Sequence, residues 1–365
     1  MKKTLNTIKK KIIPKTIKKI VNLENGKAGG RDAGHVLIVT HGAAFHPDDV
    51  CATAAALLYY GVDKTGLGKF LPGYEEIQKK HDGEFVRVVR TLDKDVMKKA
   101  TILLDVGREY DEKTNRFDHH QGGITPREDG IMYSSFGLFW KKFGKKITGN
   151  SEVSEFVDKI FVKHIDSMDN GMPIAKSLFE DQTPPLLFED LINFDADLVF
   201  GLNLPEKEIN KVFDKTFFKL IPIAQKMLIL TALKGYAQIE AKKKFQEFYS
   251  RAKDKRVIIM DQKTPFKSNE YREPLFMVYP SLRGGWAGQA VRINDLSWDT
   301  KVQFPESWAG KEATELRAVT GVDDATFAHL GRFLISAETK EGVLKMIQIV
   351  LTDIENGKIK PIFND

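Results

Sequence analysis

The segment from His35 to Tyr60 limits the possible folds of this 365-residue chain more than any other. Residues 36–39 form a short apolar run, and residues 49–60 are rich in alanine and leucine. The first pattern predicts a buried strand, and the second predicts a helix whose small residues allow close packing. Between them lie four polar residues, His41, His46, Asp48 and Asp49. They therefore fall at a strand-to-helix junction, which is where ligands usually bind in open α/β sheets.

The same alternation continues along the first half of the chain. Strands are predicted at about 35–40, 85–90 and 101–105, and helices at about 49–60, 131–143 and 151–168. This order favours a parallel α/β sheet. The third strand ends on Asp105, so two strands are expected to bring carboxylates to one edge of the sheet.

The second half of the chain has a different pattern. Helical patterns occupy residues 205–219 and 222–250, strand-like runs at 257–260, 275–279 and 286–293 suggest an antiparallel sheet, and a closing helix is predicted near 340–355. We expect a basic tail over 1–30, an α/β metal-binding domain over 31–175, a largely helical connection over 176–255 and a smaller C-terminal α+β domain over 256–365. The active site is expected in the cleft between the two domains.

Two further polar clusters follow the first. Asp118, His119 and His120 are adjacent, and three such side chains are costly to bury unless a cation or a hydrogen-bond network satisfies them. In a third segment, Asp166 and Asp169 are three residues apart and share a helix face. Five of the eight histidines fall in these three segments: His41, His46, His119, His120 and His164.

This mixture of side chains predicts a metal centre. Neutral imidazole with several carboxylates suits a divalent ion such as Mn²⁺, and a chain with one cysteine does not offer the thiolates of a structural zinc site. A shared carboxylate can bridge two ions roughly 3.5–4 Å apart, and such a pair promotes phosphoester hydrolysis. Cys51 itself is expected to be a small core residue in a reducing compartment, without a catalytic role.

Four motifs contain these clusters: THGAAFHPDD at 40–49, DVG at 105–107, FDHHQ at 117–121 and DNG at 169–171. Together they resemble the MYG1 family, a branch of the DHH phosphoesterase superfamily. The similarity continues in YSSFGLFWKKFG at 133–144, WAGQAV at 286–291, FPESWAG at 304–310 and ELRAVTG at 315–321. It covers about residues 35–345 and implies a DHH-type N-terminal domain.

The resemblance also implies roles for individual residues. Asp48 and Asp49, with His41 or His46, would supply the first metal motif, and Asp105 would bridge the ions. Asp118 and His119 would be metal ligands, with His119 the more direct one, and His120 would contact a phosphate or the attacking water. Asp166 or Asp169 would complete the site, a choice that the sequence leaves open. Better-known members have two aspartates separated by one residue in the first motif, so the ligands there also stay open. The residues expected to be catalytic are His119, His120 and Asp105.

The implied activity is a metal-dependent phosphodiesterase, a 3′-5′ exonuclease acting on RNA or single-stranded oligonucleotides with two divalent ions, Mn²⁺ rather than Mg²⁺. RNA, DNA and small nucleotides remain alternative substrates. Arginine and tryptophan side chains stack on bases, and glycines let the backbone approach a phosphate. The C-terminal residues expected to bind substrate are Arg283, Gly284, Gly285, Trp286, Arg292, His329 and Arg332, with Trp308, Lys311 and Lys340 as a further group.

Two other functional classes compete with this one. The segment His46-Pro47-Asp48-Asp49 resembles the HPDD motif of zinc-dependent N-acetylglucosamine deacetylases, although Val50 stands where that family has glutamate. That alternative gives no role to the triplet at 118–120. The other alternative is a non-catalytic RNA-binding protein with a structural metal site.

The charge is concentrated at the N-terminus. The net charge is +6, but residues 1–22 contain eight lysines and no acid, so the rest of the chain is near −2. The tail suits a solubilising extension, a nucleic-acid or membrane arm, or an organelle-targeting peptide, and we favour the first. It lacks the apolar core of a secretory signal. No stretch reaches the ~20 apolar residues of a membrane span, and we expect a cytoplasmic protein whose oligomeric state, including a homodimer, is open.

Overall fold

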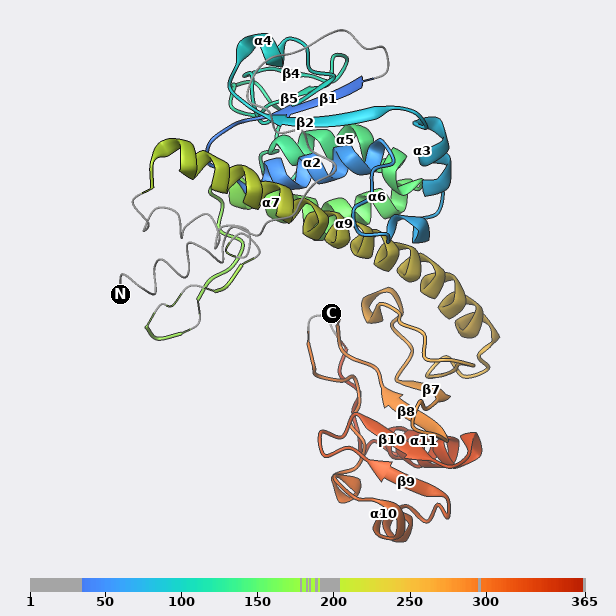
Figure 1. Ribbon diagram of the computed structural model, residues 1–365. Coiled ribbons are helices and arrows are strands. Elements are labelled where there is room, and N and C mark those ends of the chain that lie inside the picture. Colours follow the sequence, from blue (N-terminus) through green and yellow to red (C-terminus); the bar gives the residue numbers. More distant parts are fainter. Residues whose placement is uncertain are drawn as a thin grey trace, which may run out of the picture. The chain divides into compact units, whose positions relative to one another are not determined.

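The structure is a computed structural model in which residues 35–177, 179–181, 183, 185–187, 190, 204–294 and 297–363 are described. The predicted basic tail lies outside these residues. The chain divides into two compact units, Met1–Gly235 and Tyr236–Asp365, and each contains one sheet with helices (Figure 1). Both sheets mix parallel and antiparallel pairs, so the protein is a mixed α/β protein.

The sheet of the first unit has the strand order β2-β1-β3-β5-β4. Its strands are β1 (His35–Thr40), β2 (Phe85–Arg90), β3 (Ile102–Leu104), β4 (Tyr110–Asp111) and β5 (Arg116–Phe117). The three predicted strands are confirmed, and β2, β1, β3 and β5 are parallel. A short antiparallel hairpin of β4 and β5, which the sequence did not predict, makes the sheet mixed.

The register of this sheet positions the functional residues. Arg90 pairs with Thr40, Thr40 with Leu104, and Leu104 with Phe117. Four parallel strands therefore end in one row. The residues that follow three of them, His41, Asp105 and Asp118, leave the sheet at the same edge, which is the edge where α/β sheets bind ligands.

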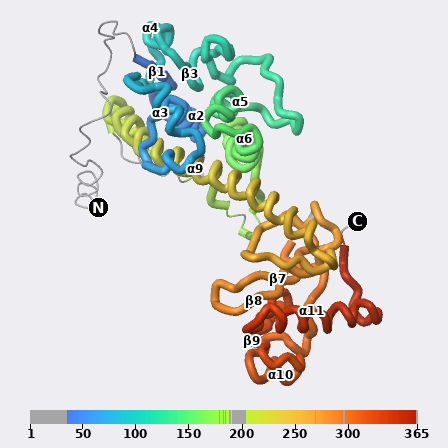
Figure 2. The backbone as a smooth tube through the Cα atoms, turned by 90° about the vertical axis from the view of Figure 1, so that its right-hand side faces the viewer, coloured from blue at the N-terminus to red at the C-terminus, as the bar shows by residue number. Residues whose placement is uncertain are grey.

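Helices cover both faces of this sheet. They are α2 (Pro47–Tyr59), α3 (Tyr74–Lys80), α4 (Lys94–Met97), α5 (Ser135–Thr148), α6 (Ser151–Val157) and α7 (Lys163–Asp169), with a π-helical turn over Asp158–Val162 and a 3₁₀ turn over Gly68–Phe70. α2 and α5 lie side by side in both backbone views (Figures 1 and 2). Four alanines of α2 are fully buried, which allows this close packing. On the other face, Val96 and Met97 of α4 pack against Val39 and Leu103.

One long helix, α9 (Glu206–Arg251), replaces the two helices predicted at 205–219 and 222–250. Pro222 lies inside it without ending it. The turns around the proline are held by burial, because Ile221 and Ala224 are buried and Gln225 donates to the carbonyl oxygen of Val62 at 2.8 Å. Tertiary contacts thus outweigh the local preference of proline to end a helix.

α9 is also the one helix, among the described residues, that is long and apolar enough to cross a membrane by length and composition alone. Half of its most apolar window is buried within the protein, as in many core helices. Lysines interrupt this window, which is why the sequence showed no continuous apolar stretch.

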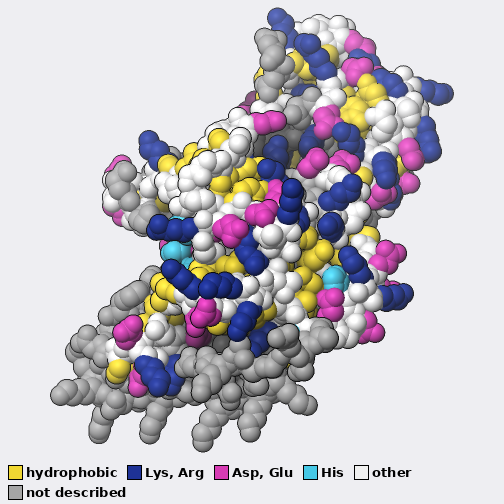
Figure 3. Space-filling view, turned by 90° about the horizontal axis from the view of Figure 1, so that it is seen from above, with side chains coloured by type: hydrophobic (Ala, Val, Ile, Leu, Met, Phe, Trp, Pro, Cys, Tyr) yellow, Lys and Arg dark blue, Asp and Glu magenta, His cyan; other side chains and the backbone are white. Residues whose placement is uncertain are grey.

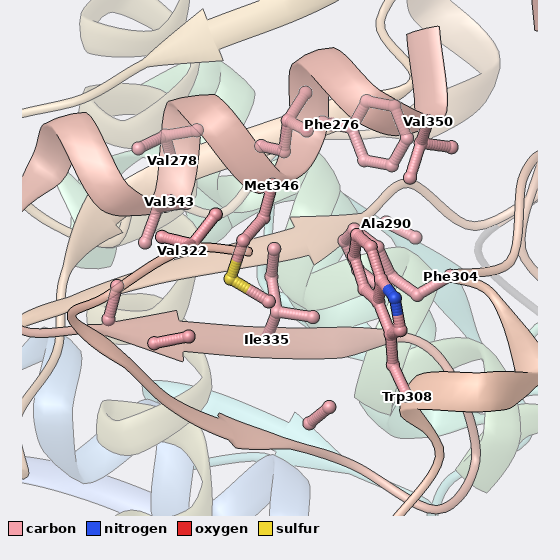
Figure 4. Close-up of a cluster of buried hydrophobic side chains, with 14 of the residues drawn as sticks. Phe276, Val278, Ala290, Phe304, Trp308, Val322, Ile335, Val343, Met346 and Val350 are labelled. Carbon is pink, nitrogen blue, oxygen red and sulfur yellow. The ribbon is translucent and has the colours of Figure 1, made fainter. Parts of the chain in front are cut away.

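The second unit contains the sheet β6-β7-β8-β10-β9. Its elements are β6 (Val257–Ile259), β7 (Phe276–Pro280), β8 (Trp286–Ala290), β9 (Ala325–Ala328), β10 (Leu334–Ala337), α10 (Ala313–Thr320) and α11 (Lys340–Glu355), with 3₁₀ turns at Ser268–Glu270 and Glu306–Trp308. The predicted strands and closing helix are confirmed. The sheet is mixed rather than antiparallel, because β6 pairs with β7 in parallel. Figure 4 shows its core, in which Met346 of α11 packs near Ile335 of β10.

Candidate metal centre

The first part of the site is the loop between β1 and α2. We call residues 41–46 the His loop, since it begins with His41 and ends with His46. Pro47 opens α2, and Asp48 and Asp49 occupy its first turn, where a helix favours negative charge. Both aspartates are completely buried, whereas His46 is exposed. Burial of two adjacent carboxylates is costly unless positive charge compensates them.

Asp105 lies at the centre of the site. It follows β3 with a φ of +54°, in the left-handed region, and it is 3% exposed. Its Oδ2 atom is 3.3 Å from Nε2 of His41, and its Oδ1 atom is 3.3 Å from Nε2 of His119. The two oxygens of one carboxylate therefore face two different imidazoles, which is the arrangement of a carboxylate that bridges two metal ions.

Two further carboxylates complete the ring of ligand atoms around Asp105. Asp49 Oδ2 lies 3.0 Å from His41 Nε2, and Asp169 Oδ2 lies 3.0 Å from His119 Nε2. Three groups have their ligand atoms within 4.8 Å of one another: His41, His46 and Asp105; Asp105, His119 and His120; and His46, Asp48 and Asp169. The groups share members, so they form one cluster rather than separate sites.

The donor set fits divalent metal ions. Both oxygens of Asp48 are buried without a hydrogen-bond donor among the described residues. Burial, and then repulsion from Asp105, Asp169 and Asp49, holds the pKa of Asp48 well above its usual range. A buried carboxylate with two free oxygens and three acidic neighbours is a position that a cation would stabilise.

Without metal ions, the imidazoles of His41 and His119 would carry the positive charge of the cluster. Burial lowers the pKa of His41 and of His119, but hydrogen bonds to Asp105 and to a second aspartate outweigh burial and raise each to about 10. Burial raises the pKa of Asp105, and hydrogen bonds from the same two histidines overcome it and bring the value to about 2. Metal ions would replace these imidazole protons, because a coordinating histidine must be neutral.

Asp118 contacts His120 rather than the centre of the cluster. Its Oδ1 atom is 2.7 Å from Nδ1 of His120, and its Oδ2 atom accepts a 2.7 Å hydrogen bond from the backbone N–H of Arg108. The His120 side chain is 51% exposed. With Nδ1 directed at Asp118, the Nε2 atom of His120 remains for a ligand, so the geometry favours an orienting role for Asp118.

The choice between Asp166 and Asp169 is clear in the structure. Asp166 is fully buried and accepts hydrogen bonds from the backbone N–H and hydroxyl of Ser134 and from the guanidinium of Arg127. Burial raises the pKa of Asp166 to about 6, and Arg127 opposes that rise. Asp169, one turn later, faces His119. Asp169 therefore belongs to the cluster and Asp166 to a neighbouring ion-pair network, while the third-segment histidine, His164, is exposed outside both.

The C-terminal residues predicted to bind substrate all lie in the second unit, and many of them have local structural roles. Gly284 and Gly285 form the β7–β8 turn with positive φ, and a Cβ on Gly285 would lie 2.4 Å from the carbonyl oxygen of Ala337. Arg283 is exposed beside them. Trp286 is partly buried against the core, with the Lys340 ammonium 5.8 Å from its ring centre.

The other predicted substrate residues also make contacts within the second unit. Arg292 packs on Trp298, 3.9 Å from its ring centre. His329 accepts a hydrogen bond from the backbone N–H of Gly331 at 2.9 Å, and Arg332 donates to the carbonyl oxygen of Phe304 at 2.7 Å. Trp308 is 3% exposed and belongs to the core. Lys311 lies 3.8 Å from Glu315 in an ion pair.

Sequence reasoning missed two arginines near the cluster. Arg127 pairs with both Asp158 and Asp166, and Arg90 contacts the His loop. No local pattern distinguishes Arg127. Arg90 ends a predicted strand at the edge where the ligands gather, and that position was the signal available for it.

The chain is similar to known proteins along most of its length. The family described as "Uncharacterised protein family (UPF0160)", MYG1_exonuc, matches residues 37–351. A "MYG1 protein" of Dictyostelium discoideum is 28% identical over 85% of this chain and 94% of its own length. A "MYG1 exonuclease" of Homo sapiens is 26% identical over 86% of this chain and 85% of its own. No solved structure matches. With a family match across most of its length, the chain belongs to the MYG1 family (UPF0160).

Proposed function

We propose that this protein is a metal-dependent phosphodiesterase of the DHH type that removes nucleotides from the 3′ end of RNA or of single-stranded oligonucleotides. The observation that carries the proposal is the position of Asp105, whose two oxygens face His41 and His119 separately. Relatives that are named "MYG1 exonuclease" support a nuclease reaction. The resemblance to DHH phosphoesterases supports the direction of cleavage and the choice of strand.

The ligand atoms divide between two ion positions. His41, His46 and Asp105 would hold the first ion. We assign Asp105, His119 and Asp169 to the second position, because His119 contacts both aspartates, and add Asp48, which shares a group of ligand atoms with Asp169. His46 lies within reach of both, and we assign it to the first because its ring is 5.6 Å from that of His41. The mixed nitrogen and oxygen donors favour Mn²⁺ over Mg²⁺, which prefers oxygen ligands and water.

In the proposed hydrolysis, some histidines bind the ions and another contacts the phosphate. Bound divalent ions would activate a water and neutralise the phosphoryl oxygens. The imidazoles of His41 and His119 must give up their protons to act as ligands. The partly exposed His120, oriented by Asp118, would donate a hydrogen bond from Nε2 to a phosphoryl oxygen as that oxygen gains charge.

The groups that could bind the nucleic-acid strand are scattered over the surface. On the face shown in Figure 3, lysine and arginine side chains of the described residues are interspersed with acidic ones. Affinity would then depend on a few contacts rather than on a continuous basic surface. The exposed Arg283, and Arg292 with the exposed Trp298, offer cationic and stacking groups for such contacts.

A substrate panel tests the proposal. Metal-free protein is supplied with Mn²⁺ or Mg²⁺ and given RNA and DNA oligonucleotides labelled at the 3′ or the 5′ end. We expect Mn²⁺-dependent release of mononucleotides from the 3′ end of RNA. Asp105→Asn should abolish it, and Asp111→Asn, which changes a carboxylate in the β4–β5 hairpin, should not. Release that continues in Asp105→Asn would contradict the assignment.

The two alternatives give different results in the same panel. The deacetylase alternative uses the histidine and aspartates at 46–49 alone and leaves His119 and Asp169 without a task. It predicts acetate release from N-acetylglucosamine derivatives and no cleavage of oligonucleotides. A non-catalytic RNA-binding protein would retain RNA in the presence of Mn²⁺ without shortening it.

A further inference from the structure

Arg90 lies at the same sheet edge as the metal cluster without being one of its ligands. It ends β2 and pairs with Thr40, the last residue of β1 before the His loop. Its side chain is 1% exposed. A charged group that is almost completely buried requires several good hydrogen bonds, and its partners show what it holds in place.

The guanidinium connects the His loop to α9. One of its terminal nitrogens donates to Oδ1 of Asp214 at 2.7 Å. The other donates to two loop carbonyl oxygens, that of Ala43 at 2.6 Å and that of Ala44 at 3.2 Å. Ala43 has a φ of +66°, a conformation that costs an alanine about 1–2 kcal/mol. The loop therefore needs external contacts to keep this shape, and Arg90 supplies two of them.

Aromatic packing fastens the same loop next to its second histidine. The Arg90 guanidinium carbon lies 5.4 Å from the ring centre of Phe45 and 4.7 Å from that of Phe217 on α9. Phe45 is 3% exposed and packs edge-on against Phe213 and Phe217. His46 follows directly, so the position of its backbone depends on how Phe45 is held.

We infer that Arg90 is a positioning residue which, held by Asp214, sets the shape of the His loop and thereby directs His41 and His46 toward the ion position that they form with Asp105. The inference rests on the two-ion centre proposed above. Lysine is a poor replacement, because one ammonium group cannot reproduce a planar fork that bonds Asp214 on one side and two carbonyls on the other.

Two measurements on Arg90→Lys test this role. The first is calorimetric titration of the metal-free protein with Mn²⁺. The affinity for the ion bound by the His loop should fall by about 10–100-fold, while the affinity for the other ion stays the same. The second is limited digestion of the metal-free protein with chymotrypsin, followed by mass spectrometry. Cleavage after Phe45 should appear in the variant and be slow in the original protein. Arg87→Lys, an equivalent change on the same strand, is the matched control and should alter neither result.

Asp214→Asn provides a second variant in case Arg90→Lys does not fold. It keeps the guanidinium and changes a side chain that is 33% exposed. We expect the affinity for the ion bound by the His loop to fall severalfold, a smaller loss than in Arg90→Lys, and the affinity for the other ion to stay the same. An equal loss of Mn²⁺ affinity at both positions would overturn the inference. So would unchanged Mn²⁺ binding and unchanged digestion in a folded variant. If the original protein binds no Mn²⁺, the metal centre and the inference fail together. If it binds two ions but cleaves no oligonucleotide, only the proposed reaction fails.

Discussion

Asp169 places a carboxylate oxygen 3.0 Å from Nε2 of His119, and this contact brings the end of α7 into the metal cluster. Asp166, on the same helix face one turn earlier, is instead bonded to Ser134 and Arg127. Two aspartates with the same local sequence context thus have different functions, because one reaches the edge of the sheet and the other faces the buried side of α5. Gly137 of α5 leaves the room, since a Cβ there would lie 2.3 Å from an Asp166 oxygen.

Separate substitutions of these two aspartates should distinguish an effect on metal binding from an effect on stability. Asp169→Asn should weaken Mn²⁺ binding and abolish Mn²⁺-dependent hydrolysis, and it should lower the free energy of unfolding by less than Asp166→Ala does. Asp166→Ala should lower that free energy by about 3–5 kcal/mol, because it removes a partner from the buried Arg127. Calorimetry with Mn²⁺ and urea unfolding measure the two effects. The reverse result, with metal binding lost only in Asp166→Ala, would show that the third ligand has been misassigned.

Asp48→Asn should stabilise the metal-free protein and prevent binding of the second ion. The aspartate is fully buried among three other carboxylates, and this raises its pKa well above the usual range. Removing the ionisable group should increase the free energy of unfolding at neutral pH in the presence of a chelator, because the unfolded chain then no longer gains free energy by ionising it. Excess Mn²⁺ should then stabilise the original protein more than the variant, which keeps only the first ion position. A variant that is less stable without metal would contradict this account of the site.

His120→Ala should slow hydrolysis without releasing the ions. The side chain is half exposed and lies closest to Asp118, at 2.7 Å. Its more distant neighbour, Asp105 at 3.6 Å, is also held by His41 and His119, so the metal ligands should stay in place. A loss of about 10²–10⁴-fold in kcat is expected if His120 acts on the phosphoryl group. Asp118→Asn should give a smaller loss of the same kind, because the imidazole then lacks the carboxylate that orients it. Calorimetric titration with Mn²⁺ is the control, and weaker binding in His120→Ala would make it a metal ligand instead.

The metal-free protein should become less stable as the pH rises from about 6.5 to 10. Hydrogen bonds to aspartates raise the pKa of His41 and His119 to about 10 from 6.5, so the folded state binds protons that the unfolded state has released. Their contribution is complete below 6.5 and is lost as the pH passes 10. Asp48, whose pKa is also raised, acts in the same direction. Thermal unfolding with a chelator across this range measures the effect.

Two histidine variants check the origin of that pH dependence. His119→Gln should flatten the fall in melting temperature, and His164→Gln, which changes an exposed histidine just before the cluster residues of α7, should leave it unchanged. Saturating Mn²⁺ should reverse the trend at moderately alkaline pH, because binding requires neutral imidazoles. An identical slope in His119→Gln would show that other groups control stability in this range.

Much of the site was predictable from local patterns in the sequence. Apolar runs followed by polar residues located β1 and β3, and the shared edge of parallel strands then brought His41 and Asp105 together. Asp118 reaches the same edge because it follows β5, but β5 has only two residues. A strand that short shows no periodic pattern from which it could be predicted. The family motifs supplied His119 and His120 where periodicity did not.

Sequence by itself therefore determined the chemistry of this protein: the imidazoles and carboxylates, the strands that end beside them, and the family to which they belong. Only the tertiary structure decided which of them meet. It placed Asp169 rather than Asp166 beside His119, directed Asp118 to His120, and buried Arg90 against the His loop. The reason is physical, since residues on one helix face or at neighbouring strand ends have the same local pattern. They differ only in the charges and donors that packing brings to them from distant parts of the chain.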